Sequence, residues 1–250
     1  MKKKLIAGNW KMNGTLQDAL DLVDGLRESW PPTSAEVFVA PSFTALRPVG
    51  ERLEGSPIGL GAQNMYYQPQ GAFTGEISPP MLKDCGCRYV ILGHSERRHV
   101  FKEDDALINR KVEAALDHGL EVVFCVGERR KERRAGDTKE VVVHQLAAGL
   151  EGISADRLRR VNIAYEPVRA IGTGDNATPE EAQEVHACIR DWVREKFGAG
   201  AAAALRIIYG GSVSPKNAGD LMACPDLDGV LVGTASLDAQ AFCAIISTVL

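Results

Sequence analysis

A single carboxylate, Glu166, stands between an apolar run and a loop rich in glycine and threonine. The run 161–165 predicts a strand, and Pro167 ends it directly after Glu166, so the acid projects from the strand's carboxyl end. Ligands bind at this edge of α/β sheets and barrels. The loop 167–176 could close over a ligand, so Glu166 would lie at a rigid strand end beside a lid. A solvated surface carboxylate is the alternative.

Two further reactive side chains follow other apolar runs. Lys11 comes shortly after the run 5–7, where its charge could pair with an anionic substrate; a surface lysine is the alternative. His94 follows the run 89–92 and precedes polar residues that open a helix. A helix N-terminus disfavours imidazolium, so a neutral His94 could donate a hydrogen bond to a carbonyl oxygen whose charge grows during proton abstraction. A capping or packing histidine is the alternative.

Small-residue turns at 210–214 and 233–236 each lead into a helix start. Their backbone N–H groups can point at an anion, and barrel enzymes place phosphate sites after the seventh and eighth strands. One such turn is weak evidence, but two in adjacent units favour a phosphate site. The segment 172–177 also fits the dinucleotide pattern G-x-G-x-x-G/A. Because residues 167–171 separate it from its strand, nicotinamide binding is not favoured.

Eight short apolar runs recur along the chain, with amphipathic helical patterns between them. The runs cover residues 5–7, 37–40, 58–62, 89–92, 122–126, 161–165, 207–209 and 230–232. Strict alternation demands parallel strands, and eight units in 250 residues predict a (β/α)8 barrel, an α/β fold with its active site at the carboxyl ends of the strands. An open doubly wound sheet is the competing layout. No linker divides the chain, so residues 1–250 are expected to form one domain.

Composition limits the classes of partner. The chain has 29 Lys and Arg against 33 Asp and Glu, and its net charge of −4 does not favour nucleic acid. The basic cluster 129–134 contains Glu132 and no aromatic residue, which favours a solvated helix face over a nucleic-acid surface. No apolar run reaches ~18 residues, so no membrane span is expected.

Six cysteines are scattered through apolar segments without a C-x-x-C pair. This pattern favours packed, reduced thiols over disulfides or a zinc site, and therefore a cytoplasmic location. The lysines at 2–4 are similar to the start of a signal peptide, but polar residues interrupt the stretch that should be apolar, so secretion is not expected. The histidines outside the His94 segment show no convergent metal spacing.

Seven ordered segments carry a resemblance, over essentially the whole length, to the triosephosphate isomerase family. The segments are Gly8-Asn9-Trp10-Lys11, Gly93-His94-Ser95-Glu96-Arg97-Arg98, Cys125-Val126-Gly127-Glu128, Ala164-Tyr165-Glu166-Pro167, Ile171-Gly172-Thr173-Gly174, Tyr209-Gly210-Gly211-Ser212 and Leu231-Val232-Gly233. The resemblance implies interconversion of dihydroxyacetone phosphate and D-glyceraldehyde 3-phosphate through an enediolate, in glycolysis and gluconeogenesis, with no cofactor and no metal.

The resemblance also implies roles for the residues that transfer protons. Glu166 would take a proton from carbon and return it to the neighbouring carbon, while His94 polarises the carbonyl and shuttles protons between the oxygens. Lys11 and Asn9 would supply electrostatic and hydrogen-bonding support, and Glu96 would support this group.

For the phosphate, the resemblance implies main-chain donors at Gly172, Ser212, Gly233 and Thr234, with the lid closing over them. Two residues depart from the family. Arg169 stands at a lid hinge where tryptophan is usual, and altered lid kinetics are expected from it. Thr234 replaces a glycine, and a β-branched residue resists positive φ; a negative φ would preserve its N–H donor.

The loop 63–76 is similar to the long loop through which this family forms homodimers, docking near the partner's Asn9 and Lys11. Two rival classes remain. A Schiff-base aldolase would use Lys11 as its nucleophile, but the carboxylate beside a lid argues against it. A catalytically silent barrel would keep phosphate affinity without turnover, and Arg169 is the feature that favours it.

Overall fold

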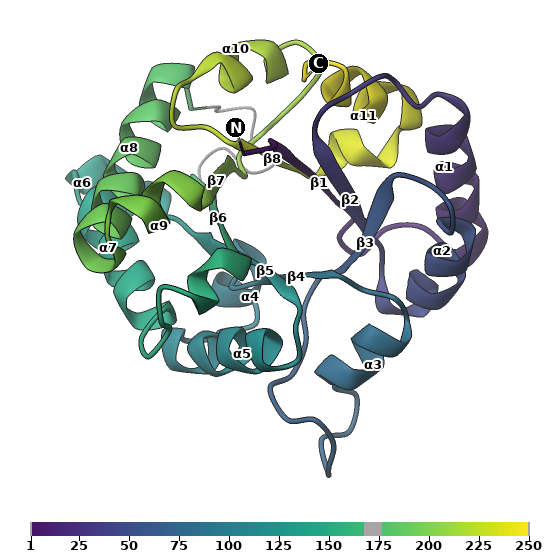
Figure 1. Cartoon of the computed structure of the whole chain (residues 1–250), viewed down its shortest axis with the longest axis horizontal. Coiled ribbons are helices and arrows are strands. Elements are labelled where there is room, and N and C mark those ends of the chain that lie inside the picture. The colour runs from purple at the N-terminus through teal and green to yellow at the C-terminus, as the bar shows by residue number, and fades with distance from the viewer. Residues whose placement is uncertain (1, 168–176, 250) are drawn as a thin grey trace.

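The protein is a closed barrel of eight parallel strands arranged in sequence order, as seen in a computed structural model that describes residues 2–167 and 177–249 (Figure 1). The strands are β1 (Leu5–Asn9), β2 (Glu36–Ala40), β3 (Ile58–Ala62), β4 (Tyr89–Leu92), β5 (Glu121–Val126), β6 (Val161–Tyr165), β7 (Arg206–Tyr209) and β8 (Gly229–Val232). The predicted (β/α)8 barrel is therefore confirmed, and the open sheet was the wrong alternative. Each predicted run lies within one of the strands.

Helices form a ring outside the barrel (Figure 1). They are α1 (Leu16–Glu28), α2 (Leu46–Arg52), α3 (Pro79–Asp84), α4 (Ser95–His99), α5 (Asp105–Asp117), α6 (Arg130–Ala135), α7 (Thr138–Gly149), α8 (Pro179–Phe197), α9 (Ala199–Ala204), α10 (Ala218–Ala223) and α11 (Ala239–Ile246). Short 3₁₀ turns lie at η1 (Phe43–Ala45), η2 (Arg157–Arg160) and η4 (Thr234–Leu237). Within residues 2–167 and 177–249, no helix combines the length and apolar character needed to cross a membrane.

Two buried layers hold the ring and the barrel together. Strand side chains that point outward share one buried cluster with helix residues, and Val90, Val122 and Ile108 of α5 all belong to it. The inward-pointing side chains form a second cluster that fills the barrel axis, with Phe38 stacked on Tyr89 at a ring-centroid distance of 4.3 Å. The alternation of outward and inward residues is the period of a β-strand closed on itself.

A closed ring of ion pairs lies at the amino ends of the strands, formed by Glu36, Arg88, Glu121 and Arg206 and called here the basal ring. Arg88 contacts Glu36 at 2.8 Å and Glu121 at 2.6 Å. Arg206 contacts the same two glutamates, at 2.5 and 3.2 Å. The charges alternate in sign around the ring, so each carboxylate has two cations and each guanidinium has two anions.

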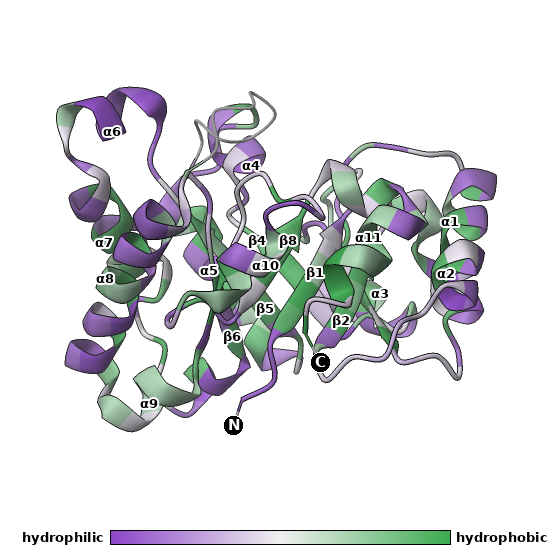
Figure 2. Cartoon of the chain, turned by 90° about the horizontal axis from the view of Figure 1, so that it is seen from above, coloured by the Kyte–Doolittle hydropathy of each residue, from purple (hydrophilic) through white to green (hydrophobic). Residues whose placement is uncertain are grey.

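The chain on either side of residues 168–176 is firmly anchored. Thr178 caps α8: its hydroxyl accepts from Glu181 N at 3.2 Å, and its own N–H donates to the Glu181 carboxylate at 3.0 Å. On the other side, Tyr165 donates its hydroxyl proton to Glu128 at 3.0 Å. Arg133, from the basic cluster, contacts both Glu128 and Glu181. Residues 130–134 of that cluster lie in α6, which contains no buried residue and is coloured as hydrophilic in Figure 2, as expected for a solvated helix.

His186, in the middle of α8, is fully buried between aromatic rings. Its imidazole meets the Tyr165 ring edge-on at a centroid distance of 5.9 Å and lies near Tyr209 at 6.4 Å. Burial lowers the pKa of His186 to about 4, although a contact with the Asp226 carbonyl at 3.4 Å opposes the shift. The folded protein thus keeps this histidine neutral where an unfolded chain would protonate it.

We expect the free energy of unfolding to fall by about 2 kcal/mol between about pH 7.5 and about pH 5 because of His186. The unfolded histidine binds a proton below its ordinary pKa of about 6.5, whereas the folded one does so only near 4, so stability is lost as the pH falls through this window. Urea midpoints at the two pH values, at fixed protein concentration, measure the loss. His186→Asn should flatten this dependence. The exposed His144 is the matched control, and an equal flattening in His144→Gln would contradict the assignment.

Candidate active site

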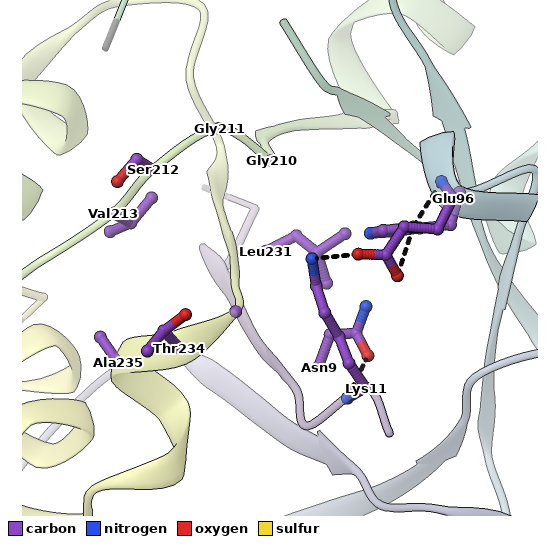
Figure 3. A pocket seen from close by; sticks show the side chains of 12 residues that line it. Asn9, Lys11, Glu96, Gly210, Gly211, Ser212, Val213, Leu231, Thr234 and Ala235 are labelled. Atoms are coloured by element: carbon purple, nitrogen blue, oxygen red, sulfur yellow. Dashed lines mark hydrogen bonds and ion pairs between the residues drawn. The ribbon is translucent and has the colours of Figure 1, made fainter. Parts of the chain in front are cut away.

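A cavity of about 270 Å³ opens at the carboxyl end of the barrel (Figure 3). Its walls come from the segments that follow β1, β4, β7 and β8, as predicted for a barrel enzyme. Asn9, Lys11 and Glu96 line one side in Figure 3, and Ser212 and Thr234 line the opposite side. Residues far apart in the sequence therefore converge on one small polar site.

Lys11 is held in an unusual backbone conformation at the edge of this cavity. Its φ is 53°, a left-handed value that few residues other than glycine adopt. Asn9, the last residue of β1, accepts a hydrogen bond from Lys11 N on its side-chain oxygen at 3.0 Å. Gln63 donates from its amide to Lys11 O at 2.8 Å and to Ala40 O at 2.9 Å. These contacts from β1, β2 and β3 fix where the lysine side chain leaves the backbone.

The Lys11 ammonium reaches across to α4. Its Nζ lies 2.7 Å from Glu96 Oε1, which joins the first and fourth strand ends. Glu96 N donates a hydrogen bond to His94 Nδ1 at 3.2 Å. Because Nδ1 accepts this bond, the neutral ring carries its proton on Nε2. His94 thus caps its own helix with its ring, which is the alternative raised by the sequence, and it is 6% exposed.

The carboxylate of Glu166 lies beside the histidine and is almost completely buried, with 1% of the residue exposed. Oε2 accepts a hydrogen bond from Ser95 N at 2.8 Å, and Oε1 lies 3.2 Å from His94 Nε2. Glu166 N donates to Val126 O at 2.8 Å, which continues the pairing of β6 with β5. The interpretation of Glu166 as a solvated surface carboxylate is therefore wrong.

Two glycines make room for this buried glutamate. A Cβ at Gly127 would lie 1.8 Å from the carbonyl oxygen of Glu166, and a Cβ at Gly210 would lie 2.8 Å from its Cγ. Neither position can hold a side chain without moving Glu166. Gly210 also lines the cavity, so this glycine borders both the buried glutamate and the place where a ligand would bind.

On the far side, the cavity is lined by Ser212, Gly233 and Thr234, which were expected from the sequence at the phosphate. Among the described residues other than glycine, only Lys11 and Lys102 have a positive φ. The β-branched Thr234 therefore does not carry the backbone strain that a positive φ would cause. Gly172 and Arg169, with the rest of the expected lid from 168 to 176, lie outside the described residues.

Several positioning contacts were not predicted. Gln63 and Ser95 belong to recognised segments, but nothing in their spacing indicated that one would hold Lys11 and the other Glu166. Arg98 is 8% exposed and donates to Gly93 O at 2.8 Å and to Cys125 O at 3.1 Å, bracing the fourth and fifth strand ends. Burial, then the nearby Glu166 charge, raises the pKa of Cys125 well above its ordinary value, so this thiol is an uncharged packing group.

The arrangement suits proton transfer at a carbon next to a carbonyl. It brings together an ammonium group and an imidazole on the wall of one cavity, with a buried carboxylate next to the imidazole. No group of three or more His, Cys, Asp or Glu side chains suited to a metal ion occurs in residues 2–167 and 177–249.

Comparisons with known proteins point to one family. The family model described as triosephosphate isomerase matches residues 4–249. The chain is 54% identical over 250 residues to the triosephosphate isomerase of Chloroflexus aurantiacus, covering 98% of this chain and 99% of that protein. It is 53% identical over 247 residues to the proteins of that name from a Roseiflexus species and from Carboxydothermus hydrogenoformans, covering 98% of this chain and 97% and 98% of the relatives.

Proposed function

We propose that Glu166, His94 and Lys11 carry out the reaction of this chain, which belongs to the triosephosphate isomerase family. The chain interconverts dihydroxyacetone phosphate and D-glyceraldehyde 3-phosphate in glycolysis and gluconeogenesis. The observation that carries the proposal is the approach of the Glu166 carboxylate to within 3.2 Å of His94 Nε2 beside the cavity. An aldolase or a silent barrel has no comparable support.

The proposed reaction begins when Glu166 leaves Ser95 N and turns toward the cavity. Its carboxylate takes a proton from the substrate carbon beside the carbonyl, and the electrons of that C–H bond form the enediolate. His94 donates from Nε2 to the carbonyl oxygen as its negative charge grows. The Lys11 ammonium, held by Glu96, and the Asn9 amide stabilise the same charge. The proton of the hydroxyl on the first carbon then passes through His94 to the former carbonyl oxygen, so that the first carbon becomes the aldehyde. Glu166, which exchanges its proton with solvent while the enediolate is bound, delivers a proton to the former carbonyl carbon.

The phosphate would lie at the opposite end of the cavity. Backbone N–H groups of Ser212, Gly233 and Thr234 would hold it, because both turns bring main chain to the cavity wall. Gly172 would add a donor from the lid, a proposal that rests on the sequence alone. Thus the reacting carbons would lie between the two walls, next to Glu166 and His94.

The test follows dihydroxyacetone phosphate by NMR in buffered D₂O, with purified protein and no coupling enzyme. Appearance of glyceraldehyde 3-phosphate with deuterium at the reacting carbon would support proton transfer through an enediolate. Turnover without deuterium from solvent would contradict that route. A covalent adduct trapped by borohydride on Lys11 would support the aldolase instead.

We also propose a homodimer formed through the loop 63–76. This loop extends away from the barrel between β3 and α3 (Figure 1), and its Tyr66, Tyr67 and Phe73 rings pack on one another at centroid distances of 4.4 and 4.6 Å. Large apolar side chains near the strand ends are exposed, including Met12 at 96% and Phe101 at 61%. Such a surface supports a protein contact.

Replacing Met12 by Glu should convert the dimer into monomers with lower kcat, because a buried charge without a partner opposes association. Analytical ultracentrifugation at micromolar protein, combined with kcat, measures both. Leu16→Glu, a charge placed on the 46% exposed start of α1, serves as a control for charge alone. A wild-type protein that sediments as a fully active monomer would refute the dimer.

We further propose that residues 1–250 form one domain located in the cytoplasm. All six cysteines are free thiols, which supports a reducing compartment. The strands close a single barrel, and the first strand pairs with the last, which supports one folding unit.

A further inference from the structure

Two residues that line the cavity, Ser212 and Thr234, carry side-chain hydroxyl groups that make no hydrogen bond to any described residue. Both side chains line the cavity, one on the turn after β7 and the other on the turn after β8. Figure 3 shows the Thr234 hydroxyl on the side of its residue that faces Ser212 and Lys11. The two loops thus present side-chain donors, in addition to main chain, to the same end of the site.

Thr234 differs in this respect from other hydroxyl residues at helix starts in this chain. The hydroxyls of Thr15, Ser78 and Thr178 each accept a hydrogen bond from a backbone N–H three residues later. Thr234 begins η4, but there the carbonyl of Gly233 takes the bonds, accepting from both N and Oγ of Ser236 at 2.8 and 2.7 Å. The Thr234 hydroxyl therefore remains available for a ligand.

At the end of the cavity formed by Ser212 and Thr234, a phosphate would have to be bound mainly by uncharged hydrogen-bond donors. Lys11 is the cation among the described residues that line it, and its ammonium is already paired with Glu96 at 2.7 Å. A doubly charged phosphate must consequently be held by N–H and O–H groups. A threonine hydroxyl suits this task because branching at Cβ limits χ1 to few positions, so little entropy is lost when the bond forms.

We propose that the Thr234 hydroxyl donates a hydrogen bond to the phosphoryl group of the substrate, so that the side chain at this position, and not only its backbone, sets phosphate affinity. The proposal rests on the isomerase function proposed above. The hydroxyl does not touch the reacting carbons, so we expect its loss to appear mainly in KM.

The test compares Thr234→Val, which keeps the shape and removes the hydroxyl, with Thr234→Ser, which keeps the hydroxyl. Thr234→Val should raise KM about tenfold, the size expected for a hydrogen bond to a charged acceptor, with kcat little changed. The inhibition constant of inorganic phosphate should rise by the same factor, and phosphate titration followed by ³¹P NMR measures that binding without turnover. Thr234→Ser should restore both constants. Thr248→Val, at an exposed residue whose hydroxyl donates to Ile245 O, controls for the substitution itself.

Unchanged KM and phosphate affinity in folded Thr234→Val would overturn the proposal, as would a serine variant that behaves like the valine variant. Circular dichroism and thermal melting establish that each variant is folded. A wild-type protein that binds inorganic phosphate and does not isomerise the triose would refute the proposed function, while the phosphate titrations would still decide the role of Thr234.

Discussion

Replacing Glu166 by Gln is expected to lower kcat by about 10²–10⁴-fold, the range that a positioned general base contributes. The amide has the shape of the carboxylate and can accept the hydrogen bond from Ser95 N that Glu166 accepts at 2.8 Å, so the barrel should remain folded. It cannot take a proton from carbon. Steady-state kinetics, together with loss of solvent deuterium from the product, would measure the effect.

Glu166→Asp distinguishes the need for a carboxylate from the need for its exact position. The shorter side chain keeps a carboxylate but withdraws it by about one methylene, and misplacement of ~1 Å can cost about 10²-fold. We expect an activity between those of the wild type and the Gln variant. Near-normal turnover in a folded Gln variant would show that another group is the base.

Replacing His94 by Gln is expected to lower kcat by about 10²–10³-fold, the loss measured when one donor to a developing oxyanion is removed. The amide could still donate a hydrogen bond, but it cannot give up and regain a proton as an imidazole does. Its altered contact with Glu96 N should cost about 1 kcal/mol of stability, as for other helix caps. KM should change much less than kcat.

His99 is the matched control for His94, because it ends the same short helix and accepts a hydrogen bond from Arg129 at 3.1 Å instead of facing the cavity. His99→Gln should retain most of the wild-type kcat. If both variants lost activity equally, the loss would report a disturbed α4 and not the removal of an acid–base group.

Much of the fold could be predicted because the barrel strands are buried on both faces and read as short apolar runs. The predicted strands β3, β4 and β6 have the same bounds as in the structure. By contrast, β2, β5 and β7 begin one residue earlier, at Glu36, Glu121 and Arg206. These residues are charged and break the apolar pattern, and their contacts in the basal ring come from strands far apart in the sequence.

The site was predictable in its residues but not in its geometry. Lys11, His94 and Glu166 could be found because each follows an apolar run and the ends of parallel strands meet at one edge. The hydrogen bond that Ser95 N donates to Glu166 joins loops that no local spacing connects. The positive φ of Lys11 depends on Gln63, 52 residues away, and likewise leaves no mark on the local sequence.

The basal ring also limits the route by which substrate and product reach and leave the active site. Its four charges span the amino end of the barrel, and the Phe38–Tyr89 stack belongs to the cluster that fills the axis above them. The interior of a barrel filled in this way is a packed core and not a channel that runs from end to end. The ketose and the aldose must therefore enter and leave through the same opening, at the carboxyl end of the barrel. Each product molecule has to dissociate before the next substrate molecule can bind.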